Sequence, residues 1–73
     1  MMESDTPKGK KVPVSYQAVV WIGMAALRRE PKAGLDIEDV LRKGEQLNIV
    51  AEQDGFCQLD NSLWIFQLAI QKT

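Results

Sequence analysis

The sequence predicts a small all-β barrel, and three observations support this fold class. The chain has 73 residues, which suffices for one domain around one hydrophobic core. Residues 14–22 are rich in β-branched and aromatic side chains, which favour a pleated sheet surface. The second half alternates apolar and polar residues between closely spaced turns, a pattern typical of short strands that curl into a barrel.

The N-terminal segment is predicted to be a flexible arm. Pro7, Gly9 and Pro13 interrupt it, so neither a helix nor a strand runs cleanly through these residues. We therefore expect an arm over residues 1–13 and a barrel domain over residues 14–73.

The middle of the chain has weaker patterns. The apolar run of residues 14–22 resumes, after one glycine, over residues 24–27. Residues 32–39 are predicted to form a loop, because Gly34 permits unusual backbone angles and three acidic side chains favour hydration. A short helix over residues 37–42 is the alternative, since the apolar positions there also fit helical spacing.

The strand pattern is clearest from residue 47 onward. Leu47, Ile49 and Ala51 are expected on the inner face of one strand, with Asn48 and Glu52 on its outer face. The alternation of side chains along a strand is the basis of this prediction.

Two turn signals divide the rest of the C-terminal half. Asp54-Gly55 indicates a tight hairpin, because such a turn between twisted strands needs positive φ angles. We expect a strand over residues 56–59, a second turn over residues 60–62 and a further strand over residues 63–66.

A pattern of small signals along the chain resembles the bacterial SH3-like (SH3b) domain family, over roughly residues 18 to 70. The resemblance consists of an arginine and a proline after the first segment, a Lys-Gly pair before the central strand, a glycine and an aromatic residue after the hairpin turn, and a tryptophan in the last strand. The matching positions are Arg28, Pro31, Lys43, Gly44, Gly55, Phe56, Trp64 and Ile65.

The resemblance implies a five-stranded SH3-like barrel that binds peptides, peptidoglycan stems or partner proteins through a groove lined by aromatic side chains and loops. A fold alone does not assign a function, so the resemblance favours a binding module but does not identify its ligand.

The composition argues against catalysis and against a bound cofactor. Histidine is absent, which removes the commonest general base and the commonest metal ligand. Cys57 is the only cysteine, so a disulfide within the chain and a cysteine-based zinc site are both excluded. We expect Cys57 to be a buried, inert thiol in a protein that is not an enzyme and has no cofactor or metal. A single free thiol favours the reducing cytoplasm, with export to the cell envelope as the alternative.

The charge balance argues against nucleic-acid and membrane partners. Nine basic and ten acidic residues give a net charge of −1, unlike the basic surface of a nucleic-acid-binding domain. No apolar stretch is long enough to span a bilayer, so we expect no membrane insertion.

Two groups of residues are the candidates for ligand or partner binding. Asp36, Glu38 and Asp39 are predicted to form an acidic rim that attracts a basic segment of a partner, with a solvated loop face as the alternative. Phe56 and Trp64 are expected on the outer face of adjacent strands, either as an aromatic platform for a ligand or as a cap on the barrel.

The run containing Val20, Trp21 and Ile22 does not alternate, which indicates that both faces of its strand are buried. A barrel of this size has one interior, so the second face would contact the arm or another chain. We therefore predict a protein interface at these three residues, with a homo-oligomer as one form of it.

These expectations favour a non-enzymatic binding module that recognises a protein or peptide in a bacterium or phage. The alternatives are a cell-envelope domain that binds peptidoglycan and a structural subunit of a larger assembly such as a phage particle.

Overall fold

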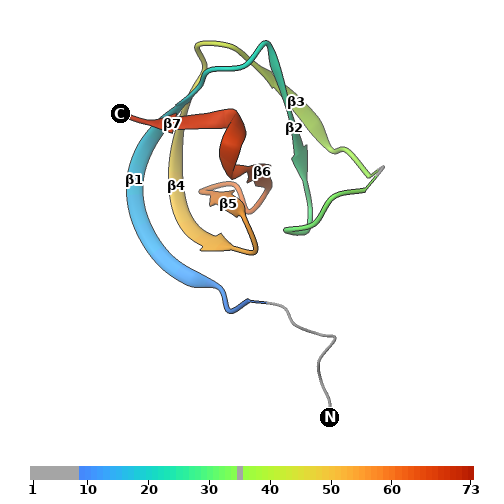
Figure 1. Ribbon diagram of the computed structural model, residues 1–73, viewed down its shortest axis with the longest axis vertical. Coiled ribbons are helices and arrows are strands. Elements are labelled where there is room, and N and C mark those ends of the chain that lie inside the picture. The colour runs from blue at the N-terminus through green and yellow to red at the C-terminus, as the bar shows by residue number, and fades with distance from the viewer. Residues whose placement is uncertain (1–8, 35) are drawn as a thin grey trace.

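The computed structural model describes residues 9–34 and 36–73 and shows an all-β chain (Figure 1). Most of the predicted N-terminal arm, residues 1–8, lies outside the described residues. Within the described residues the chain forms seven strands and one 3₁₀ turn, η1. The elements are β1 (Val12–Val20), β2 (Met24–Arg28), β3 (Asp39–Arg42), β4 (Gln46–Gln53), β5 (Phe56–Leu59), β6 (Trp64–Phe66), η1 (Gln67–Ala69) and β7 (Ile70–Lys72).

The strands pair in one antiparallel sheet in the order β3-β2-β6-β5-β4-β1-β7. Figure 1 shows that the sheet curls strongly, but β3 and β7 remain its two edges and the pairing of the described strands does not close it. The all-β prediction is confirmed, whereas the five-stranded closed barrel differs from the observed sheet. The additional strands are β3, which arises where a loop or a helical turn was expected, and β7, which follows η1 at the C-terminal end.

The first strand, β1, is strongly curved (Figure 1) and pairs with β4 on one side and β7 on the other. It begins at Val12, two residues before the predicted domain boundary, and its register with β4 shifts between Pro13 and Tyr16. Proline lacks the N–H group of a ladder bond, so a position near the start of a strand beside an irregularity suits it.

The absence of alternation around Val20 has a simple cause: β1 ends there. Within β1 the side chains of the second half alternate between the interior and solvent, as in a strand with one buried face. Trp21 and Ile22 follow the strand, so they obey no strand periodicity. The inference that both faces of one strand are buried is therefore wrong.

The predicted hairpin turn at Asp54-Gly55 is confirmed. Asp54 has φ 53° and Gly55 has φ 81°, the two positive angles that a type I′ turn requires. Gly44 has φ 96° in the turn that joins β3 to β4, where the Glu45 N–H donates to the Arg42 carbonyl at 3.1 Å. Glycine adopts this left-handed backbone without the clash that a Cβ atom causes.

The inner core lies on the concave side of the curled sheet. Leu27, Ile49, Ile65, Val20 and Cys57 are its largest fully buried side chains. They come from five different strands, so the sheet must curl to bring them together.

A second, smaller cluster buries Ala51, Phe56 and Trp64 on the other face of the same strands. Phe56 is 8% exposed and Trp64 is 5% exposed, so the two rings do not form the exposed aromatic platform that was one of the two expectations. The alternation argument placed them correctly on the face opposite Cys57, but that face has its own apolar cluster. The Phe66 ring contributes to its cover, with its centroid 5.5 Å from that of Phe56.

An irregularity between Ile49 and Ala51 explains how β4 serves both clusters. The register of β4 with β5 shifts there, as it does at a β-bulge. Ile49 belongs to the inner core, Ala51 belongs to the outer cluster, and Glu52 reaches back to the inner Tyr16 hydroxyl. The predicted sharing of one face by Ile49 and Ala51 is therefore wrong, because strict alternation assumes an unbroken ladder.

Candidate binding surface

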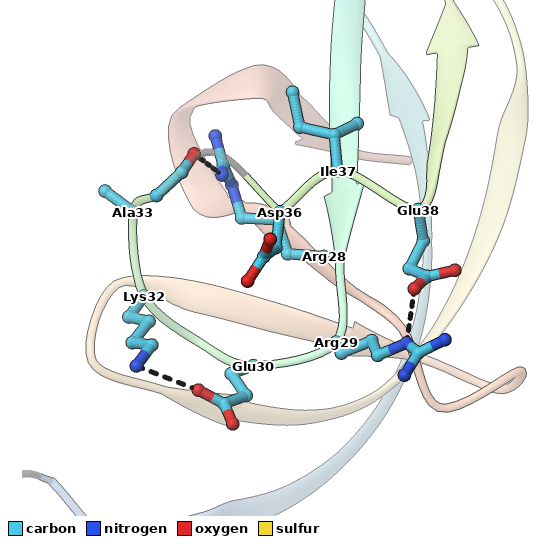
Figure 2. Close-up of a pocket in the computed structure, with 9 residues that line it drawn as sticks. Arg28, Arg29, Glu30, Lys32, Ala33, Asp36, Ile37 and Glu38 are labelled. Carbon is cyan, nitrogen blue, oxygen red and sulfur yellow. Dashed lines mark hydrogen bonds and ion pairs between the residues drawn. The ribbon is translucent and has the colours of Figure 1, made fainter.

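The described residues of the loop between β2 and β3, 29–34 and 36–38, make several polar contacts with one another and with the ends of the two strands. The Arg28 guanidinium donates a hydrogen bond to the Gly34 carbonyl across the loop (Figure 2). The Lys32 N–H donates to the Glu30 carbonyl at 2.8 Å, and the Glu38 N–H donates to the Leu27 carbonyl at 2.8 Å. These bonds hold described residues on both sides of the loop, which we call the β2–β3 loop.

Two ion pairs balance the charge of this loop. Arg29 pairs with Glu38, and the Lys32 amine lies 3.0 Å from a Glu30 carboxylate oxygen (Figure 2). Exposed pairs of this kind each contribute about 0–1 kcal/mol, so they affect the charge pattern more than stability. The surface differs from the purely acidic rim predicted from the sequence, because cations of the same loop lie beside the acids.

The β2–β3 loop borders a first hollow of about 670 Å³. Its lining carries three cationic and three acidic side chains together with small and apolar ones. The lining residues are Arg28, Arg29, Glu30, Lys32, Ala33, Gly34, Asp36, Ile37 and Glu38. The structure thus brings together the predicted site residues Asp36 and Glu38, whereas Asp39 lies at the start of β3 and bonds to the backbone of that strand.

A second hollow of about 580 Å³ lies between the β2–β3 loop and the β4–β5 turn. Its lining residues are Glu30, Pro31, Lys32, Ala33, Gln53, Asp54 and Phe56. Phe56 therefore borders a concave surface although most of its ring is buried, while Trp64 does not line this hollow. Glu30, Lys32 and Ala33 line both hollows, so the loop forms a wall between them.

The three predicted interface residues have different environments. Val20 is 1% exposed and packs in the inner core, so it is not available to a partner. Ile22 is half-buried against that core. Trp21 is 53% exposed, and its indole N–H donates to the Leu68 carbonyl at 2.9 Å, which fixes the ring against η1.

A cluster of interacting side chains that the sequence patterns did not reveal lies beside the inner core. The Tyr16 hydroxyl donates to a Glu52 carboxylate oxygen at 2.6 Å and lies 3.4 Å from the Cys57 sulfur. The Lys72 amine lies 4.5 Å from the centre of the Tyr16 ring, a cation–π contact. Most of these residues are far apart in the sequence, and the pairing of β1 with β4 and β7 and of β4 with β5 brings them together.

The surroundings of this cluster disfavour ionised Tyr16 and Cys57. Burial raises the pKa of the Tyr16 hydroxyl, and its bonds to Cys57 and Glu52 act in the same direction. Burial likewise raises the pKa of the Cys57 thiol, and the nearby Glu52 charge adds to the effect although the Tyr16 bond opposes it. A thiol with a raised pKa, 0% exposed, is a poor nucleophile.

Metal-ligating side chains do not gather in the part of the chain that the structure describes: no group of three or more histidine, cysteine, aspartate or glutamate residues is placed to hold an ion. Among the same residues, no helix is long and apolar enough to cross a membrane.

Comparisons with known proteins found no relative of this chain. No protein-family model, no curated protein and no solved structure matches it.

Proposed function

We propose that this chain is a non-enzymatic, SH3-like binding module that recognises a protein or peptide segment of a bacterium or phage. The observation that supports this proposal most directly is the β2–β3 loop with a hollow on each side. Hydrogen bonds already hold described residues of this loop, and residues held before binding lose less conformational entropy when a ligand docks.

Several positions that carry the family resemblance have structural roles consistent with it. Gly44 and Gly55 occupy left-handed backbone positions. Arg28 holds the tip of the β2–β3 loop, and Pro31 lines the second hollow. The strong curl of the sheet also accords with an SH3-like arrangement, although it has more strands than the five that the family pattern implies.

The second hollow indicates the chemistry of the ligand. Phe56, Pro31 and Ala33 offer apolar contact, while Glu30 and Lys32 place one charge of each sign at its rim. Apolar lining with a few polar groups is typical of a site that binds a side chain and fixes its orientation. We therefore propose a peptide that places an apolar residue over Phe56 and a polar or charged neighbour beside the loop.

Filling the hollows tests this function. Ala33 lines both of them and is exposed, so Ala33→Trp should block both without disturbing the core. A library of random peptides would be panned against the unmodified chain, and the selected peptides would be measured against both proteins by calorimetry. We expect Ala33→Trp to weaken binding at least about tenfold, equivalent to roughly 1.4 kcal/mol.

Gln71→Trp is the matched control, since it adds the same bulk at an exposed position on β7, away from the loop. It should bind the selected peptides like the unmodified chain. A library that yields no binder, or binders indifferent to Ala33→Trp, would contradict the proposed site.

A further inference from the structure

The edge strand β3 presents two backbone N–H groups away from the sheet. The Lys43 N–H donates to the Gly23 carbonyl at 3.1 Å, in the same register that pairs Arg42 with Met24. Backbone groups of antiparallel strands face the neighbour at every second residue, so Leu41 also faces β2. Val40 and Arg42 must therefore direct their N–H groups to the open edge.

Both of these outward N–H groups are bonded to side-chain carboxylates. The Val40 N–H donates to Asp39 Oδ1 at 2.7 Å, and the Arg42 N–H donates to Glu45 Oε2 at 2.8 Å. Asp39 and Glu45 are both exposed, so water could have satisfied these donors without them. Two carboxylates thus occupy the positions that the carbonyl groups of a further strand would take.

An open edge strand is a template for the addition of another strand, and native proteins commonly block such edges with charged side chains. The two carboxylates block the edge of β3 in two ways: they occupy its donors, and they place negative charge beside the path of an incoming backbone.

The charge pattern of β3 and its flanks indicates which chain would pair with it. Acidic Glu38 and Asp39 lie at one end of the segment, and basic Arg42 and Lys43 lie at the other. In an antiparallel pair of two copies with Val40 opposite Val40, the acidic end of each segment lies beside the basic end of the other. Opposite charges facing each other across strands stabilise a pair by roughly 0.2–1 kcal/mol.

The centre of such a pair is apolar and accessible. Val40 is 42% exposed at the edge, and its outward N–H and carbonyl groups would face those of the second Val40. The net charge of −1 gives the two copies little overall repulsion.

We propose that the β3 edge is a self-complementary pairing surface, and that Asp39 and Glu45 cap its N–H groups to keep it from joining a second copy of this chain. The role of Asp39 is then to protect an edge, which differs from the partner-attracting role predicted from the sequence.

Removing both caps tests the proposal. The Asp39→Ala/Glu45→Ala variant should form a dimer of about twice the 8.2 kDa chain mass at high micromolar concentration, measured by light scattering after size exclusion. The unmodified chain should remain monomeric under the same conditions. Glu30→Ala/Asp36→Ala is the matched control, because it removes the same charge from the β2–β3 loop without uncapping β3, and it should also stay monomeric.

A third substitution shows whether the dimer uses the β3 edge. Adding Val40→Pro to the uncapped variant removes an outward donor and leaves the bonds to β2, so it should restore the monomer. Adding Trp21→Ala instead should leave the dimer intact. Circular dichroism confirms that each variant is folded before it is weighed.

Three results would overturn the proposal: a folded uncapped variant that stays monomeric, a dimer that persists with Val40→Pro, or a dimer that dissociates with Trp21→Ala. The first would show that the caps do not restrain pairing, and the other two would place the contact elsewhere on the chain.

Discussion

The Tyr16 hydroxyl shows how a single polar atom joins three strands. It lies in β1, bonds to Glu52 of β4 and approaches Cys57 of β5, beside an otherwise apolar core. Because the fold favours the protonated forms of Tyr16 and Cys57, the folded state holds protons that the unfolded chain releases at alkaline pH. Such groups contribute stability below the unfolded pKa, and this contribution is lost as pH rises above it.

This loss of stability at alkaline pH can be measured. The unfolding free energy should fall between about pH 8 and about pH 10.5, because the ordinary pKa values of a thiol and a tyrosine lie in or near that window. Urea titrations at the two pH values measure it. The Cys57→Ala/Tyr16→Phe variant should be less stable at about pH 8 but should show a smaller loss on going to the higher pH. An equal loss in both proteins would show that other groups cause the alkaline effect.

At the scale of elements, the turns and the irregularity in β4 determine which face each strand presents. The Asp54-Gly55 turn fixes the register of β4 with β5, and the shift between Ile49 and Ala51 transfers the strand from the inner core to the outer cluster. Gly55 is essential to this geometry because its φ is 81°.

Gly55→Ala should destabilise the fold by roughly 1–2 kcal/mol, the cost of a left-handed backbone for a residue with a Cβ atom. Gly23→Ala is the control: an added Cβ meets no atom within 4 Å there, and Gly23 does not have a left-handed φ. It should be neutral or stabilise the chain by up to about 1 kcal/mol, through a less flexible unfolded state. Chemical denaturation measures both variants, and equal effects would mean that the turn does not depend on glycine.

At the scale of the whole molecule, one sheet separates two apolar clusters. Cys57 and Ile65 belong to the inner core, whereas Phe56 and Trp64, their neighbours along the same two strands, belong to the outer cluster. The same strands contribute side chains to both clusters, so unfolding these strands would expose both clusters at once. The chain should therefore unfold as one cooperative unit.

Tryptophan fluorescence tests this cooperativity. In the Trp21→Phe variant the remaining tryptophan, Trp64, reports on the outer cluster, while far-ultraviolet circular dichroism reports on the whole sheet. The two signals should give the same urea midpoint. In the reciprocal Trp64→Phe variant the exposed Trp21 should be quenched by acrylamide in the folded state. A fluorescence transition that precedes the loss of sheet would show that the outer cluster melts separately.

Local sequence patterns were enough to predict the all-β class, the hairpin at Asp54-Gly55, the bounds of the strand over residues 56–59 and the placement of Cys57 in the inner core. These features depend on local rules: the two-residue period of a strand and the φ angles of particular turn residues. The burial of Phe56 and Trp64, in contrast, depends on the packing of a second apolar cluster on the outer face, which no local rule predicts.

The tertiary structure also showed that β3 is an edge strand whose outward N–H groups are capped by Asp39 and Glu45. The sequence patterns could not show this, because it depends on which strands become neighbours. Aspartate and glutamate occur at many positions of the chain, and any of them could accept a hydrogen bond from a backbone N–H group. The order of the strands in the sheet determines which N–H groups lack a neighbouring strand and therefore need such an acceptor.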